Sequence, residues 1–244
     1  MKQLLIDGII KQEINGDSME VTLIDKMGTD LTVVNAARVS FGKKKKKFTD
    51  ADAKLINYLA RHNHWTPFGH CSLQFHIVAP VFVARQLVKH QVGLVWNEIS
   101  RRYVDTDPEF YTPEKWRLRA EDKKQGSSEQ VYYNEVVTKD AFDESIPSPG
   151  GNPYEMPTYK TICENARTAY NSMIKLGVCP EQARMVLPQS MMTEWYWSGT
   201  LMAFARVCNL RCKPDTQKET REIANQIDEL TGDLFPVSWE ALRK

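Results

Sequence analysis

The stretch "CSLQFHIVAPVFVARQLVKHQ", residues Cys71–Gln91, joins two periodicities and thereby indicates the fold class. In its first half, apolar and polar residues alternate, as they do in a strand that buries one face. The apolar face carries Cys71, Leu73, Phe75 and Ile77, and the opposite face carries Ser72, Gln74 and His76. Pro80 then stands where a helix can begin, and a helical pattern follows over residues 81–91. A strand that leads directly into a helix predicts a mixed α/β fold.

The helix of this stretch carries polar side chains on one face. Phe82, Gln86, Lys89 and His90 lie at i, i+4, i+7 and i+8, so the three polar groups point the same way. The polar character continues to Tyr103 through an Asn-Glu pair and two arginines. The sequence therefore predicts that residues 82–103 form a helix and a loop whose polar face holds ligands.

The rest of the chain predicts one domain rather than two. A strand is expected over residues 21–25, and helices over residues 31–38 and 51–64, the second capped by Thr49 or Asp50. Four further helical patterns with Pro and Gly at their ends cover residues 158–177, 180–188, 193–211 and 214–232. Residues 105–157 are rich in charged, Gly, Ser and Pro residues. They are interpreted as a variable insertion or loop region within a single domain of residues 1–244.

The composition excludes several classes of protein. The 244-residue chain has 42% apolar and 26% charged residues and a formal net charge of +1. Such a neutral chain is not expected to coat nucleic acid, and no apolar run reaches the ~18–20 residues that span a membrane. The N-terminal segment lacks a signal-peptide cleavage pattern, and the five cysteines include no Cys-x-x-Cys pair. These features predict a cytoplasmic protein with reduced thiols.

Arginines inside or beside apolar segments are the strongest chemical signal. A buried guanidinium is costly unless it is paired, and its planar fork suits phosphate. The arginines in this setting are Arg85, Arg101, Arg102, Arg184, Arg206 and Arg211. Since the sequence has no glycine-rich phosphate loop, they predict a phosphorylated small molecule bound through side chains. The five consecutive lysines, Lys43–Lys47, repel one another and predict a mobile, solvated loop.

A cluster of histidines raises the question of a metal site. The cluster consists of His62, His64, His70, Cys71 and His76. Their spacings match no closed zinc set, so capping, packing and hydrogen bonding are the preferred interpretation and no metal is expected.

Two cysteines raise the question of a nucleophile. Cys208 and Cys212 lie at i and i+4, near Arg206 and Arg211, which would lower the pKa of a thiol. Buried cysteines are more often packing residues, and that interpretation is preferred here.

Six short motifs, in this order, resemble the flavin-dependent thymidylate synthases, the ThyX family. They are "ARVSF" (Ala37–Phe41), "HWTPFGH" (His64–His70), "FVARQLVKHQ" (Phe82–Gln91), "NEISRRY" (Asn97–Tyr103), "ARMVLP" (Ala183–Pro188) and "NLR" (Asn209–Arg211). The resemblance extends from Val21 to about Ile227, apart from residues 105–157. It implies an α+β (mixed α/β) domain in which helices flank a mostly antiparallel central sheet.

The resemblance also implies a homotetramer whose active sites are built from several subunits. The pattern over residues 193–211 agrees with this expectation, because a helix there would be apolar nearly all round. One chain is not expected to cover such a helix completely.

A reaction and its cofactors follow from the same resemblance. Members of this family transfer a methylene group from 5,10-methylenetetrahydrofolate to dUMP and make dTMP. Tightly bound FAD, reduced by NADPH, supplies the hydride. The implied partners are dUMP and folate, with no nucleic acid and no membrane. Two alternatives stay open: a flavin and nucleotide enzyme that makes another 5-substituted pyrimidine, and a non-catalytic nucleotide-binding homologue.

Positions that match the family's functional residues define the expected site. The dUMP-binding positions are Gln86, Lys89, Glu98, Ser100, Arg101, Arg102, Arg184 and Arg211. The FAD-binding positions are Ser40, Thr66, Lys89, His90, Gln91, Glu98, Thr200 and Arg206. Arg211 is the expected catalytic residue, since an arginine against the uracil ring favours ionisation at N3 and so raises the nucleophilicity of C5.

The flavin side departs from the family pattern. The signature Arg-His-Arg reads Lys89-His90-Gln91 here, and the loop after it is one residue longer. The acid of the family's "TPFEH" motif is Gly69 in this chain. Lysine is a point donor rather than a fork, and glutamine carries no charge, so the flavin is expected to be held differently. Trp96, in the lengthened loop, is expected to fill the core rather than to stack on the flavin.

Overall fold

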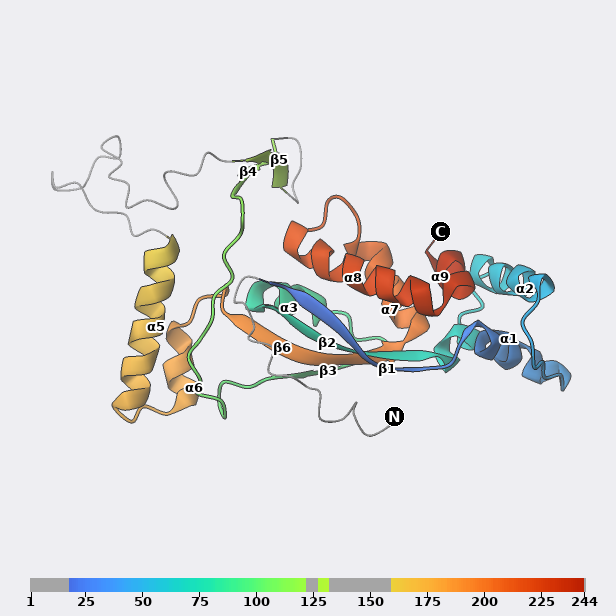
Figure 1. Ribbon diagram of the computed structural model, residues 1–244, viewed down its shortest axis with the longest axis horizontal. Coiled ribbons are helices and arrows are strands. Elements are labelled where there is room, and N and C mark those ends of the chain that lie inside the picture. Colours follow the sequence, from blue (N-terminus) through green and yellow to red (C-terminus); the bar gives the residue numbers. More distant parts are fainter. Residues whose placement is uncertain (1–17, 122–126, 132–158, 244) are drawn as a thin grey trace, which may run out of the picture.

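The alternating stretch after Cys71 forms strand β2, Ser72–Pro80, which lies inside a four-stranded sheet. The computed structural model describes residues 18–121, 127–131 and 159–243, and Figure 1 shows how their elements are arranged. The strand order is β1-β2-β6-β3, and every neighbouring pair is antiparallel. The other three strands are β1 (Glu20–Met27), β3 (Leu94–Glu98) and β6 (Met192–Thr200). The expected mixed α/β domain with an antiparallel sheet is confirmed.

Strand β2 buries the face that its sequence pattern predicts. Leu73, Phe75 and Ile77 are buried in the core, whereas Gln74 and His76 on the opposite face remain half-buried. Across the core, the ring of Phe75 meets Phe204 edge-on, with centroids 5.1 Å apart. Burying a large apolar side chain contributes roughly 1.5–3 kcal/mol, so this face alone strongly favours the observed register.

Three helices from the C-terminal part of the chain cover one side of the sheet (Figure 1). They are α7 (Leu201–Arg211), α8 (Lys218–Leu234) and α9 (Pro236–Leu242). Helix α8 was expected from its pattern, and it buries Ile223 and Ile227. Helix α9 was not expected. No helix in the described part of the chain combines the length and the hydropathy that crossing a bilayer requires.

The N-terminal helices follow their sequence patterns closely. They are α1 (Asp30–Arg38), the 3-10 helix η1 (Val39–Phe41), α2 (Asp50–Arg61) and the 3-10 helix η2 (Thr66–His70). Thr49 caps α2 as expected, through a reciprocal capping box with Asp52. Its backbone N–H donates to the Asp52 carboxylate at 2.9 Å.

The helix expected over residues 193–211 is wrong in its first half. Residues Met192–Thr200 form strand β6, and α7 begins only at Leu201. The aromatic run alternates, because Trp195 and Trp197 are buried while Tyr196 lies on the opposite face. Gly199 permits a close approach to β3, since a Cβ at this position would lie 2.6 Å from the Gly93 carbonyl oxygen.

The segment expected to be a helix and a loop, residues 82–103, also contains a strand. Helix α3 covers Val81–Leu87, and β3 follows at Leu94–Glu98 along the edge of the sheet. Trp96 stacks on Trp195 with ring centroids 4.4 Å apart and packs against the core, as expected. The helix expected over residues 180–188 is shorter: α6 (Pro180–Ala183) is followed by the 3-10 helix η3 (Arg184–Val186). Helix α5 (Tyr159–Lys175) agrees with its pattern.

The variable region of residues 105–157 is only partly described. It contains the paired strands β4 (Arg117–Arg119) and β5 (Ser127–Val131). Arg117 donates to the Glu219 carboxylate of α8 at 2.7 Å, so this part is tied to the domain. Residues 122–126 and 132–158 lie outside the described part, as do residues 1–17, where the absence of a signal peptide was expected.

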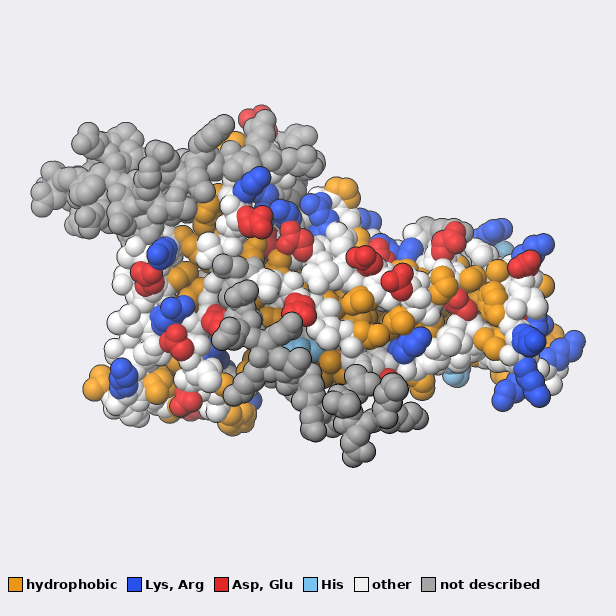
Figure 2. All heavy atoms as spheres, in the orientation of Figure 1, with side chains coloured by type: hydrophobic (Ala, Val, Ile, Leu, Met, Phe, Trp, Pro, Cys, Tyr) orange, Lys and Arg blue, Asp and Glu red, His pale blue; other side chains and the backbone are white. Residues whose placement is uncertain are grey.

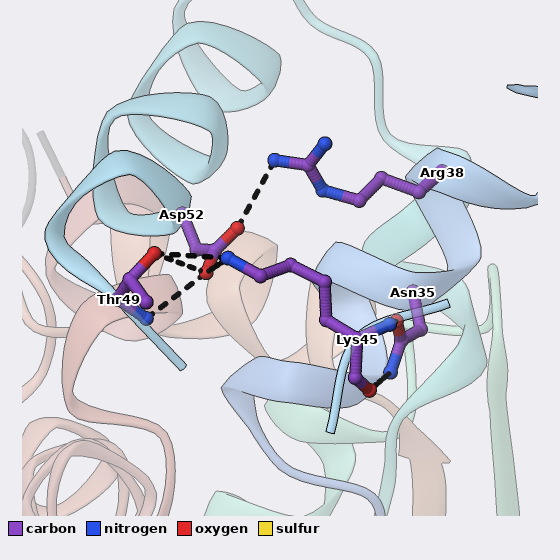
Figure 3. A network of polar contacts seen from close by, with 5 residues as sticks. All are labelled: Asn35, Arg38, Lys45, Thr49 and Asp52. Atoms are coloured by element: carbon purple, nitrogen blue, oxygen red, sulfur yellow. Dashed lines mark hydrogen bonds and ion pairs between the residues drawn. The ribbon is translucent and has the colours of Figure 1, made fainter. Parts of the chain in front are cut away.

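The five-lysine segment is solvated at four of its lysines, as expected, but its middle residue is held by contacts that the sequence did not predict. Asn35 of α1 binds the backbone of Lys45 on both sides: the Lys45 N–H donates to its Oδ1 at 2.7 Å and its Nδ2 donates to the Lys45 carbonyl at 3.0 Å. The Lys45 ammonium pairs with the fully buried carboxylate of Asp52, which Arg38 also binds at 3.1 Å (Figure 3). Like-charge repulsion within the run is therefore offset by a carboxylate seven residues from Lys45.

Hydrogen bonds decide the charge of this buried carboxyl. Burial by itself raises the pKa of Asp52, but hydrogen bonds from Lys45, Thr49 and Arg38 outweigh burial and lower the pKa from 3.8 to about 2. The carboxylate therefore remains charged in the folded protein at neutral pH.

We expect Asp52→Asn to lower the free energy of unfolding by about 1–3 kcal/mol, because the amide leaves two cations without their partner. Since the folded pKa lies below the ordinary value, the network stabilises the native protein above about pH 4 and is lost as the pH falls further. Urea unfolding at several pH values measures both effects. Asp50→Asn, in the same helical turn but exposed, is the control. Equal stability losses in the two variants would contradict the role given to Asp52.

Candidate active site

Three of the residues expected to bind the nucleotide line one cavity of about 440 Å³. They are Glu98 at the end of β3, Arg101 in the turn that follows, and Arg184 of η3. Arg85 of α3 lines the same cavity; the sequence predicted it as one of the arginines for a phosphorylated ligand, but not among the positions that match the family's nucleotide-binding residues. Within the described residues, the guanidinium groups of Arg85 and Arg184 have no hydrogen-bond or ion-pair partner. The cavity thus presents uncommitted guanidinium groups, which suit an anionic ligand.

The sheet positions the carboxylate of this cavity. Glu98 ends β3 opposite Trp195, and the ladder continues as the Ile99 N–H donates to the Glu194 carbonyl at 3.0 Å. The Glu98 carboxylate accepts hydrogen bonds from Thr193 Oγ1 at 2.8 Å and from Trp96 Nε1 at 3.3 Å. A fixed carboxylate beside guanidinium groups can accept from a ligand hydroxyl while the arginines bind its anionic part.

The turn after β3 places Arg101 in the lining of this cavity and Arg102 outside the cavity. Arg101 donates to the Thr106 carbonyl and lies 6.0 Å from the centroid of the Tyr170 ring. Ser100 Oγ accepts from the Arg102 backbone N–H at 3.3 Å and from its Nε at 3.1 Å. Ser100 and Arg102 do not line the cavity.

A second group of expected residues meets between α3 and α7. The Arg211 Nε donates to His90 Nε2 at 3.0 Å, and its Nη2 donates to the Gln86 carbonyl at 3.4 Å. The Gln86 side chain donates to Gln217, just before α8. The helix expected over residues 81–91 ends at Leu87, so His90 lies beyond it and does not share a helical face with Gln86 and Lys89. Gln86 and His90 nevertheless meet at Arg211, away from the cavity of Glu98.

Burial sets the charge state of this pair. Burial, with a further contribution from the nearby Arg211 cation, lowers the pKa of His90 from its ordinary value of 6.5. The ring is therefore neutral at neutral pH and accepts through Nε2, which leaves its proton on Nδ1. Burial also lowers the pKa of Arg211. Among the described side chains no carboxylate pairs with Arg211, so its positive charge is not neutralised.

The remaining expected FAD-binding residues near the signature motif differ in how many contacts they make within the chain. Lys89 and Gln91 lie exposed just beyond α3, and Arg206 is exposed on α7. Thr200 caps α7, because its hydroxyl accepts from the Ala203 N–H at 3.2 Å. The Thr200 N–H donates to the Gly93 carbonyl at 3.1 Å, so the signature loop is held at the start of α7.

The last two expected flavin residues line a separate cavity of about 460 Å³ between α1, α2 and η2. Ser40 and Thr66 lie there with Asn63, His64 and Trp65. The Ser40 hydroxyl donates to the Ala37 carbonyl at 3.3 Å, and the Trp65 side chain is 54% exposed. An exposed indole beside polar groups offers a stacking surface for a planar ring.

Within one chain, eight of the expected residues therefore form three separate groups, and the other six lie outside them. The sequence missed Gln217 and Trp65 as members of these groups, and it gave Arg85 only as one of the arginines for a phosphorylated ligand. Arg85 directly precedes Gln86 on the helix, and successive helical residues point about 100° apart, so the two face different sites. That spacing was the available signal for a second functional face on α3.

The histidine cluster does not assemble into a metal site. His62 packs against Tyr58, with ring centroids 4.3 Å apart, and His76 Nε2 lies 2.8 Å from the Glu194 carboxylate. The described residues contain no group of three or more His, Cys, Asp and Glu side chains arranged to hold a metal ion.

The cysteine pair offers no exposed thiolate beside the arginines. The hydrogen bond with Cys212 and burial raise the pKa of Cys208, whose thiol donates to the Ala224 carbonyl at 3.6 Å. The same contact with Cys208 lowers the pKa of the half-buried Cys212. Cys71 is buried, and burial raises its pKa to about 11.

Known proteins are similar to this chain in sequence and in fold. The chain matches the family described as "Thymidylate synthase complementing protein" over residues 22–237. Flavin-dependent thymidylate synthases from Thermus thermophilus and Kosmotoga olearia are each 37% identical to it. The matches cover 92% and 91% of this chain and 75% and 88% of those relatives. The chain belongs to the flavin-dependent thymidylate synthase family.

This chain is also similar in its fold to a protein of solved structure. The UMP/dUMP methylase PolB from Streptomyces cacaoi, bound with 5-Br dUMP, superimposes with a TM-score of 0.71 and 28% sequence identity. The similarity covers 92% of this chain and 94% of PolB. The resemblance drawn from six short motifs is confirmed, and the protein is an enzyme of the thymidylate synthase type.

We expect Arg211→Gln to raise the pKa of His90 towards its ordinary value, because the variant removes a nearby cation but keeps much of the burial. A proton titration of the His90 ring by NMR in the cofactor-free enzyme measures this change. The folded protein binds this proton more weakly than the unfolded chain, so acidification below pH 6.5 favours unfolding through this group.

Arg206→Gln is the control, since Arg206 lies on the same helix but is exposed. It removes an equal charge without removing the contact with His90. If both variants shift the His90 titration equally, the specific contact between Arg211 and His90 is not its cause.

Proposed function

We propose that the enzyme converts dUMP to dTMP, with 5,10-methylenetetrahydrofolate as the one-carbon donor and NADPH as the source of reducing equivalents. Family membership supports the reaction, and the state of Arg211 supports the mechanism. This guanidinium is half-buried, held by a neutral imidazole and without a carboxylate partner among the described residues. A fixed and uncompensated cation of this kind stabilises an anion that develops next to it.

In this mechanism Arg211 lies against the pyrimidine and stabilises negative charge as the N3 proton leaves. The additional electron pair raises the nucleophilicity of C5, which bonds to the methylene carbon as a bond from that carbon to a folate nitrogen breaks. C5 then releases its proton to solvent. No thiolate attack is needed, which agrees with the buried thiols of Cys71 and Cys208. His90 supports the step by orienting the guanidinium through its Nε2 acceptor.

The 440 Å³ cavity is the proposed site for the phosphate and sugar of the nucleotide. Arg101 and Arg184 would bind the phosphate, and Arg85 adds a third arginine to the lining of the same cavity. Glu98 would accept a hydrogen bond from the sugar hydroxyl. Lys89, Ser100, Arg102 and Gln86 are proposed to complete the contacts from outside this cavity.

The residues present suit a flavin dinucleotide. Ser40 and Thr66 line the second cavity beside the exposed ring of Trp65, and Lys89 and Gln91 present exposed polar groups beyond α3. His90, Glu98, Thr200 and Arg206 are the other proposed FAD-binding residues. Reduced FAD, when bound, supplies the hydride that completes the methyl group.

We further propose a homotetramer in which different subunits contribute to one active site. Eight of the expected residues form three separate groups in one chain, which is the arrangement that a shared site would need. The edge strand β3 also carries exposed apolar side chains, with Val95 71% exposed and Val92, just before it, 76% exposed. Residues 193–211 do not form the apolar helix that the sequence suggested as an interface, because half of that segment is a strand.

A second substrate is favoured by one observation. The structurally similar PolB is named as a methylase of both UMP and dUMP. UMP is therefore the alternative substrate that we propose, and 5-methyluridine monophosphate is the corresponding product.

Incubation with dUMP, 5,10-methylenetetrahydrofolate, FAD and NADPH should yield dTMP, identified by chromatography and mass; a parallel reaction with UMP tests the alternative. We expect Arg211→Ala to lower turnover by roughly 10²–10³ while FAD remains bound, because one preorganised charge is lost. Arg119→Ala, on the exposed end of β4, is the matched control. Absence of both products from FAD-loaded protein would refute the proposed function, and near-normal turnover of Arg211→Ala would refute the mechanism.

Light scattering at micromolar concentration should give the mass of four chains, because the exposed apolar edge and the divided site both need neighbouring subunits. A dilution series that yields only the mass of one chain, in protein that still makes dTMP, would show that the site is complete within a monomer.

A further inference from the structure

The lysine loop, defined as Lys43–Lys47, concentrates charge at one end of a nearly neutral chain. Figure 2 shows Lys and Arg side chains gathered at the end of the molecule that holds α1 and α2. Four of the lysines are exposed: Lys43, Lys44, Lys46 and Lys47. No hydrogen bond or ion pair within the described residues engages their ammonium groups. The loop therefore presents several cations that no acidic side chain in this part of the chain neutralises.

The fifth lysine holds the other four in place. Asn35 forms hydrogen bonds with the backbone of Lys45, and the Asp52 carboxylate forms an ion pair with its ammonium group (Figure 3). A free lysine run would lower its repulsion by moving its charges apart. Here the anchor at the middle of the run restricts that relaxation, so the loop remains a preorganised cationic surface that an anion would stabilise.

The position of the loop indicates which anion. Ser40, three residues before the loop, lines the 460 Å³ cavity. Ala36 and Ala37 line it as well, and they continue the same helix as Asn35. Trp65, whose side chain is 54% exposed, and Thr66 line the cavity too. A cavity with an aromatic surface and a cationic loop following one wall suits a ligand that joins planar rings through a charged diphosphate.

We propose that the lysine loop is the diphosphate-binding rim of the flavin dinucleotide site. This inference rests on the proposed function. It assigns a phosphate-binding role to residues outside the signature motif. Within that motif, Lys89-His90-Gln91, two arginines of the family pattern are replaced by lysine and glutamine. The exposed lysines act as point charges on the diphosphate, while Lys45 acts only as the anchor.

The test is the quadruple variant K43Q/K44Q/K46Q/K47Q, which keeps Lys45 and its ion pair with Asp52. Calorimetry and flavin fluorescence give dissociation constants for FAD, ADP and riboflavin. We expect the variant to bind FAD and ADP at least about tenfold more weakly, as the loss of a few exposed ion pairs predicts. Its affinity for riboflavin should be unchanged. The native protein should also lose FAD affinity with added salt more steeply than the variant.

The control variant is K115Q/K160Q/K175Q/K218Q, which removes the same charge from exposed positions elsewhere. Circular dichroism checks that both variants remain folded. The proposal is overturned if the loop variant binds FAD and ADP as tightly as the native protein does. It is also overturned if the loop variant loses riboflavin affinity by the same factor, or if the control variant loses as much FAD affinity as the loop variant. In those cases FAD binding and dTMP formation by the native protein still support the proposed function. A native protein that binds no flavin and forms no product would overturn both.

Discussion

The pairing of β2 with β6 determines where the reactive groups lie. The two strands run antiparallel in unbroken register from Ser72 opposite Thr200 to Pro80 opposite Met192. Helix α3 leaves the end of β2, and helix α7 leaves the end of β6, so the helices start from opposite ends of the pair. Their C-terminal regions then meet, which brings His90 within hydrogen-bond distance of Arg211. A slip of one residue would turn the two buried tryptophans of β6 outwards, so core packing specifies this meeting.

Local periodicity in the sequence correctly predicted the elements that bury an apolar face and leave the opposite face partly exposed. Strand β2 and helix α8 each show a clear apolar face in the sequence and bury that face in the structure. Strand β6 was misread because its polar side chains look like interruptions in an apolar helix. Their partners come from a distant strand: Ser198 accepts from Gln74, and Glu194 lies beside His76. Such long-range pairs leave no trace in the local pattern. Likewise, repulsion among the lysines was visible in sequence, but the burial of Asp52 was not.

The composition of the candidate site was predictable, and its arrangement was not. Motifs in a fixed order identified the family and the residue types that it uses. They gave no indication that Glu98, Arg101 and Arg184 share one cavity while Gln86 turns away from it towards Gln217. Arg85 and Gln86 show why: neighbours in sequence diverge on a helix, and only the packing of α3 between the sheet and α8 decides which side each one serves.

The contact between Gly93 and Thr200 has a dynamic consequence. Gly93 has a positive φ of 76°, and a Cβ there would lie 3.2 Å from the Cβ of Ala203, so the loop fits closely against the start of α7. Its carbonyl accepts the Thr200 N–H, and on the other side the Leu201 N–H donates to the Cys71 carbonyl. The loop after the signature motif and the first turn of α7 therefore form one cooperative unit for local opening. In hydrogen exchange, the amides of this junction would open together, so the loop would gain mobility only when the helix that carries Arg211 begins to fray.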